Sequence, residues 1–147
     1  MATEWTDEAV LSRFPAAAID RDNIEYYRGL LRSELMVNRC QACRTWHHPP
    51  RPVCPHCWSE RVVPTEVSGD ARIFMHTVLH LGPAAEGIDY EAGYTLVTAE
   101  LVEQEGLRIS APLVNGGTTE PELGAPVRLT WVERDGHPLP AFEPVDR

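Results

Sequence analysis

The sequence predicts a mainly β chain with helices at its N-terminus, a cysteine-rich metal-binding segment and a small OB-like barrel. Three observations predict this: apolar residues at helical spacing in the first third, four paired cysteines within eighteen residues, and short alternating strands after residue 64. The 147 residues, 43% of them apolar, suffice for a globule with a buried centre. We expect three parts, residues 1–36, 37–63 and 64–147.

Two helices are expected before the cysteines. The segment from Thr6 to Arg13 has the composition of a short helix that ends before Pro15. Between Asp20 and Leu35, apolar residues recur at steps of three and four, which places them on one helical face. Asp22 and Glu25 have the spacing of a capping box that opens this second helix.

A cytoplasmic location is expected. No run approaches the roughly 18 apolar residues of a membrane span, and the N-terminus lacks the features of a secretory signal. A reducing compartment disfavours structural disulfides, so clustered cysteines there indicate metal binding or thiol chemistry.

The four cysteines form two C-x-x-C pairs, Cys40 with Cys43 and Cys54 with Cys57, separated by ten residues. Each pair directs two sulfurs at one ion, and two pairs complete a tetrahedron, so the spacing predicts a structural zinc ion. Four protein ligands leave no open position for water or substrate. Bound iron and a redox dithiol pair are the alternatives.

Three histidines lie close enough in sequence to compete as ligands: His47, His48 and His56. A four-cysteine site needs none of them, and we expect His47 and His48 to be exposed strand or loop residues. No serine has a glycine-flanked elbow, and no glycine-rich phosphate loop is present. The sequence therefore names no catalytic residue.

The C-terminal part contains four regions of strand formers, within residues 73–79, 94–101, 107–113 and 127–131, with turn residues at Asn115-Gly116-Gly117 and Asp135-Gly136. Four or five antiparallel strands in about 80 residues suit an OB-like barrel. The connection from Gly82 to Gly93 is long and apolar for a loop, which makes it a candidate contact surface.

Several segments together resemble the OB-fold, rubredoxin-like zinc-ribbon family formerly known as DUF35. They are a helix running into C-x-x-C, the run from Pro49 to Cys57 (PPRPVCPHC), the Val67-Ser68-Gly69 entry into the strands, and Leu139-Pro140-Ala141-Phe142. The resemblance covers about residues 20–144. Relatives often have glycine after the second cysteine of each pair, whereas this chain has Arg44 and Trp58, which need an uncommon backbone state or another turn.

The resemblance implies a non-catalytic subunit that docks on an acyl-CoA enzyme: a thiolase, a thiolase-like aldolase or acyltransferase, or an enoyl-CoA hydratase. It implies support of that enzyme's assembly and acyl-CoA binding, with a coenzyme A thioester at the shared interface. Candidate exposed apolar side chains are Trp46, Trp58, Ile88, Tyr90 and Tyr94, although core packing explains each equally well.

The alternative function is a nucleic-acid-binding module, since zinc ribbons and OB folds recur in such proteins. The formal charge of −9 argues against it, because single-strand binders need a positively charged groove. A modest basic group does surround the cysteines, and the same residues suit the phosphates of coenzyme A: Arg39, Arg44, Arg51 and Arg61. A redox protein that binds iron is a third alternative.

Overall fold

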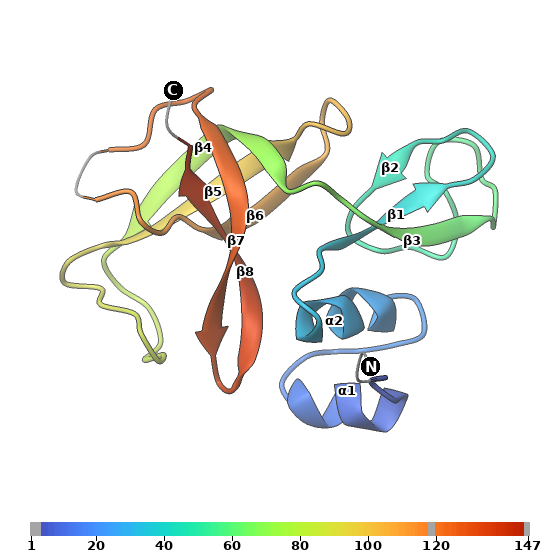
Figure 1. Ribbon diagram of the computed structural model, residues 1–147, viewed down its shortest axis with the longest axis horizontal. Helices are drawn as coiled ribbons and strands as arrows, with labels where there is room; N and C mark the ends of the chain where they lie inside the picture. Colours follow the sequence, from blue (N-terminus) through green and yellow to red (C-terminus); the bar gives the residue numbers. More distant parts are fainter. Residues whose placement is uncertain (1–3, 118–119, 146–147) are drawn as a thin grey trace. The chain divides into compact units, whose positions relative to one another are not determined.

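The computed structural model describes residues 4–117 and 120–145, which contain two helices and eight strands (Figure 1). The chain folds as two compact units, residues 1–67 and 68–147. The prediction of a mainly β chain is confirmed. Among the described helices, none has the length and apolar character needed to cross a membrane.

The first unit begins with α1 (Asp7–Arg13) and α2 (Ile24–Leu31). The predicted first helix is confirmed, and the Thr6 hydroxyl caps it by accepting a hydrogen bond from the Ala9 N–H at 3.2 Å. Arg28 of α2 joins the helices because its guanidinium reaches both the Asp7 carboxylate, at 2.5 Å, and the backbone oxygen of Trp5.

The second helix is shorter than the predicted span from Asp20 to Leu35, and its start differs from the expected capping box. The Asp20 carboxylate accepts hydrogen bonds from the N–H groups of Asp22 and Asn23, at 2.8 and 3.1 Å. This side-chain turn holds Asp22 outside the helix, and Asn23 occupies the N-cap position.

The C-terminal end of α2 explains why Leu35 lies outside it. Ser33 has a φ of 55°, and the Glu34 N–H donates to the Gly29 oxygen at 2.9 Å while the Ser33 N–H donates to the Leu30 oxygen at 3.0 Å. This is a Schellman motif, in which a left-handed residue ends the helix and satisfies its last carbonyl groups. The chain then turns into the first strand.

A three-stranded antiparallel sheet, ordered β2-β1-β3, carries the cysteine pairs. Its strands are β1 (Met36–Cys40), β2 (Trp46–His47) and β3 (Val62–Glu66). Strand β3 pairs along all of β1, with Cys40 opposite Val62 and Met36 opposite Glu66. Because of this pairing, the first unit continues past residue 63.

The second unit is a five-stranded antiparallel sheet, ordered β6-β5-β4-β7-β8, that curls into a nearly closed barrel (Figure 1). The bounds are β4 (Asp70–Leu79), β5 (Tyr94–Leu101), β6 (Arg108–Pro112), β7 (Pro126–Arg134) and β8 (His137–Pro144). A parallel bridge between Leu113 and Phe142 links the end of β6 to β8. The predicted OB-like barrel is confirmed.

Strand β8 tolerates three prolines because all of them face away from β7. Pro138, Pro140 and Pro144 lie opposite Glu133, Trp131 and Val127 of β7. Their backbone nitrogens point the same way as the Phe142 carbonyl, because backbone direction alternates along a strand and all four are even-numbered positions. The Phe142 carbonyl points away from β7 and accepts the Val114 N–H at 2.8 Å. A proline in this orientation removes no hydrogen bond from the β7–β8 ladder.

Gly69 lies at a close approach between the start of β4 and Leu129 of β7. Its φ is +88°, and a Cβ atom there would lie 2.7 Å from the Leu129 Cβ. We expect Gly69→Ala to lower the free energy of unfolding by about 2 kcal/mol or more, measured by urea denaturation. Gly106→Ala is the matched control, since its φ is +82° but its Cβ would meet nothing within 4 Å; it should cost about 1 kcal/mol. Equal costs would contradict the close packing.

Candidate metal centre

The first cysteine pair lies in a tight turn between β1 and β2. The Arg44 N–H donates to the Cys40 oxygen at 3.0 Å, and the Cys40 N–H donates to the Thr45 oxygen at 2.9 Å. The Ala42 N–H points at the Cys40 sulfur, 3.4 Å away. Backbone donors therefore both shape the turn and stabilise negative charge on sulfur.

The second pair repeats this geometry with different side chains. The Trp58 N–H donates to the Cys54 oxygen at 3.0 Å, and the Cys54 N–H donates to the Ser59 oxygen at 2.9 Å. The His56 N–H points at the Cys54 sulfur at 3.4 Å. The two pairs are thus equivalent knuckles.

Both knuckles use a left-handed residue where glycine has the least steric cost. Arg44 has a φ of 68° and Trp58 a φ of 64°. The uncommon backbone state expected from the sequence is therefore present at both positions. The backbone hydrogen bonds within each knuckle hold these turns although a side chain makes the left-handed conformation unfavourable.

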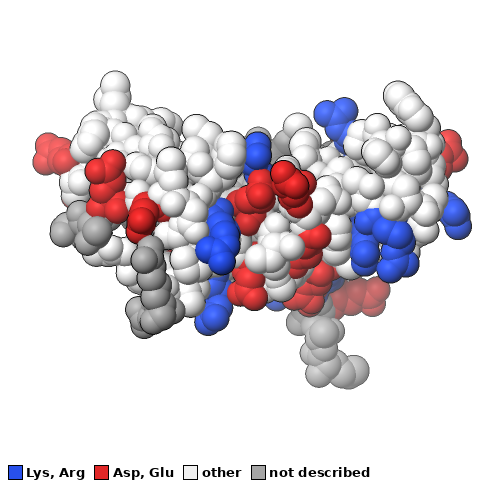
Figure 2. All heavy atoms as spheres, turned by 90° about the horizontal axis from the view of Figure 1, so that it is seen from above, with Lys and Arg blue, Asp and Glu red and all other residues white. Residues whose placement is uncertain are grey.

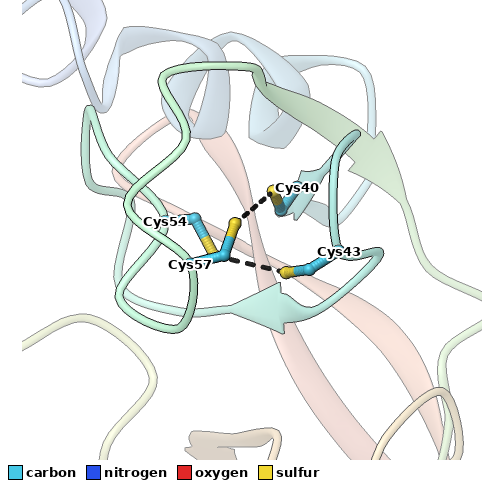
Figure 3. Close-up of side chains that lie close together, drawn as sticks. All are labelled: Cys40, Cys43, Cys54 and Cys57. Carbon is cyan, nitrogen blue, oxygen red and sulfur yellow. Dashed lines mark hydrogen bonds between the residues drawn. The ribbon is translucent and has the colours of Figure 1, made fainter.

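The four sulfurs meet in one cluster, all within 4.8 Å of one another (Figure 3). The Cys40 and Cys57 sulfurs are 3.6 Å apart, and those of Cys43 and Cys54 are 3.7 Å apart. Both distances are too long for a disulfide, and all four cysteines are free. Tetrahedral zinc with bonds of about 2.3 Å places its sulfurs about 3.8 Å apart, so the cluster fits the ion.

Backbone donors favour the thiolate form at Cys40. The Cys43 N–H, and after it the N–H of Ala42, outweigh desolvation and lower the pKa of Cys40 to about 6. At Cys57 the Ser59 N–H lowers the pKa, but desolvation and the other three sulfurs outweigh it and raise the pKa to about 11. Four adjacent thiolates repel one another, so a divalent cation is needed to hold them all deprotonated.

None of the three candidate histidines joins the sulfur cluster among the described residues. The expectation that His47 and His48 are exposed is wrong: His47 is 7% exposed and His48 is half-buried. His48 packs on the Tyr26 ring with centroids 5.4 Å apart. The expectation failed because a two-residue strand is too short for its sequence to show which face is covered.

The candidate exposed apolar side chains differ in how far the structure buries them. Trp46 is 9% exposed and lies under the Arg39 guanidinium, 4.9 Å from its ring centroid, whereas Trp58 is 79% exposed. Tyr90 and Tyr94 are half-buried and meet edge to face, with ring centroids 6.3 Å apart. Ile88 is also half-buried.

The connection from Gly82 to Gly93 is held against the β7–β8 turn. The Glu86 carboxylate accepts the Asp135 N–H at 3.2 Å, and the Tyr90 hydroxyl donates to the Pro83 oxygen at 3.1 Å. Asp135 and Gly136 have φ values of 52° and 79°, as expected for a turn at this position. The loop is thus ordered by polar contacts that its sequence did not indicate.

Two zinc knuckles on a small sheet, followed by an OB-like barrel, define a zinc-ribbon protein of the OB-fold class. The family model described as "ChsH2, rubredoxin-like zinc ribbon domain" matches residues 28–63. A chain of the solved "Ltp2-ChsH2(DUF35) aldolase" is 35% identical, with a TM-score of 0.77 over 87% of this chain and 98% of that chain. This similarity shows that the chain belongs to the DUF35 family, and its metal is structural zinc.

Two further similarities extend the comparison. The chain is 35% identical over 143 residues to a "Probable enoyl-CoA hydratase alpha subunit" of Thermomonospora curvata; the match covers 97% of this chain but only 43% of that relative. A DUF35-family protein of unknown function from Sulfolobus solfataricus is 14% identical, with a TM-score of 0.60 and 96% of each chain covered. That likeness shows the fold alone.

The buried histidines predict a pH dependence of stability. Burial is the main cause that lowers the pKa values of His47 and His48 below the ordinary 6.5. Below about pH 6.5 the unfolded chain therefore binds more protons than the folded chain. The contribution of these histidines to the free energy of unfolding is complete above that pH and is lost as the pH falls toward the lowered pKa values of the folded state. Urea denaturation between pH 7.5 and 5.5 measures the fall.

His48→Phe should make this fall shallower while it keeps the ring contact with Tyr26. All four cysteines are retained, so the acid sensitivity of the metal site is common to the variant and the wild type. Exposed His80→Phe is the control and should keep the wild-type dependence. An identical fall in His48→Phe and wild type would contradict the role of His48.

Proposed function

We propose that this chain is a non-catalytic zinc-binding subunit that docks on an acyl-CoA-processing enzyme and supports its assembly and acyl-CoA binding. The observation that carries the proposal is the match to nearly all of the DUF35 chain in the Ltp2–ChsH2(DUF35) aldolase. The partner class is a thiolase, a thiolase-like aldolase or acyltransferase, or an enoyl-CoA hydratase. The cytoplasm, where thiols stay reduced, is the proposed location.

The similarity to a hydratase alpha subunit supports the same partner class. The chain spans 43% of that relative's length, so the relative carries more than the region matched by this chain. A DUF35 region within a subunit named for acyl-CoA chemistry fits a role beside an acyl-CoA enzyme. We propose that a coenzyme A thioester lies at the interface between this chain and its partner.

Zinc has a structural role in this proposal, with Cys40, Cys43, Cys54 and Cys57 as its ligands. Four protein sulfurs close the coordination sphere, so the ion holds the fold and has no open position for a substrate. The segment between β2 and β3, residues 48–61, contains no strand in the described structure. Its second knuckle is therefore the part of the ribbon that depends most on the ion.

Co-purification from the native host tests the proposed function. We expect the tagged chain to capture a stoichiometric thiolase-like or hydratase-like enzyme, identified by mass spectrometry, with one zinc per chain by metal analysis. The captured enzyme should lose acyl-CoA affinity when the chain is removed. A zinc-loaded chain that is isolated alone, or with nucleic acid, would contradict the proposal.

Replacement of one ligand tests the metal assignment. Cys54→Ser should lose most of its zinc and unfold the ribbon, because metal binding and folding are coupled in small sites. Heteronuclear NMR would show the loss in residues 36–66, while resonances of the barrel, which has its own core, persist. His56→Ala, between the ligands of the same knuckle, is the control and should retain zinc. A folded, fully loaded Cys54→Ser protein would refute the assignment.

A further inference from the structure

Trp58 stands out among the large apolar side chains of the ribbon. It directly follows the ligand Cys57, its side chain is 79% exposed, and it makes no ring or cation–π contact within the described residues. Trp46, by comparison, is 9% exposed and covered by Arg39. Of the two tryptophans of the ribbon, Trp46 is therefore packed and Trp58 is exposed to solvent.

The backbone at Trp58 gives no reason for a large side chain. Its φ of 64° is a conformation that glycine adopts without the steric cost a side chain brings, about 1 kcal/mol. Exposure adds the cost of hydrating an indole ring. Neither local conformation nor core packing accounts for a tryptophan at this position. Tryptophan is enriched among the residues that dominate binding energy in protein interfaces.

The charge around the knuckles indicates the kind of surface that Trp58 meets. Residues 36–67 contain four arginines and two glutamates, in a chain whose formal charge is −9. Three of the arginines gather at the first knuckle: the Arg39 Nε donates to the Arg44 oxygen at 3.3 Å, and the Gln41 N–H donates to the Arg61 oxygen at 2.8 Å. Figure 2 shows basic side chains on the surface of the ribbon unit.

Two of these guanidinium groups are available for a partner. Arg44 and Arg61 are exposed, and neither side chain has an ion pair with another described residue. The zinc–thiolate centre carries a formal charge of −2, but backbone N–H groups face its sulfurs, and the arginines lie outside it. Arg44 follows Cys43, Trp58 follows Cys57, and the Arg61 oxygen is bound by the Gln41 N–H, so the backbones of all three residues adjoin the sulfur cluster.

We infer that the knuckle end of the ribbon, defined by Trp58, Arg44 and Arg61, is a docking surface for an acidic face of the catalytic subunit, with Trp58 as its central anchor. The inference rests on the proposed function and adds the surface through which it operates. A protein fits better than a nucleic acid, because the bare aromatic is single and residues 68–147 contain thirteen acidic against five basic side chains.

The test compares Trp58→Gly with the wild type in binding to the acyl-CoA enzyme that the wild-type chain captures. We expect the affinity for the purified enzyme to fall at least about tenfold, the scale of an anchor residue. Zinc content should be unchanged, and the melting temperature should be equal or higher, because glycine relieves the left-handed backbone. Leu81→Ala, which removes a side chain that is 87% exposed on the barrel unit, is the control and should bind normally.

Two further measurements identify the occupant. Arg44→Glu with Arg61→Glu should weaken binding most at low salt, whereas Arg128→Glu on the barrel should not. A photoreactive benzoylphenylalanine at position 58 should cross-link to the catalytic subunit, and the same group at position 81 should not. A single-stranded oligothymidine that binds the wild type and is released by Trp58→Gly would assign the surface to nucleic acid and overturn the inference.

The two proposals fail in different ways. If the wild type captures no acyl-CoA enzyme, the proposed function is wrong, and the named occupant is wrong with it. If the wild type and Trp58→Gly bind the captured enzyme equally and position 58 gives no cross-link, the docking surface is wrong while the proposed function stands.

Discussion

The convergence of four sulfurs is the constraint on which the ribbon depends. The three-stranded sheet is small, and β2 has only two residues, so its own ladder cannot order the fourteen residues that separate β2 from β3. The knuckle turns are closed by the same hydrogen bonds in each pair, and these turns place all sulfurs within 4.8 Å. The metal therefore provides what a hydrophobic core provides in larger domains.

The barrel meets a different constraint, which is the closure of a five-stranded sheet. Strand β8 closes the barrel. One of its edges pairs with β7, and at the other edge the Phe142 carbonyl accepts a hydrogen bond from the Val114 N–H, just after β6. Three prolines on the outward side of β8 leave few free donors, which limits pairing with other chains. The Phe142 side chain is fully buried in the same strand, so one residue serves both closure and core.

The division of labour between the units fits the proposed subunit role. Among the described residues, the ribbon has an exposed tryptophan and two arginines without an ion pair next to the sulfur cluster, whereas residues 68–147 are strongly acidic. A metal that is closed by protein sulfur contributes rigidity and no chemistry, and rigid presentation lowers the entropic cost of binding. Both properties are expected of a protein that acts through its partner.

The sequence by itself predicted the cluster of four sulfurs, because residue type and C-x-x-C spacing limit which sulfurs can share an ion. It also predicted four strands of the barrel, three from a period of two that one buried face imposes and one from its strand-forming residues. Tertiary structure decided what local pattern cannot encode: the burial of His47, the pairing of the proline-containing strand β8, and which tryptophan is covered. Each depends on atoms contributed by residues distant in the chain.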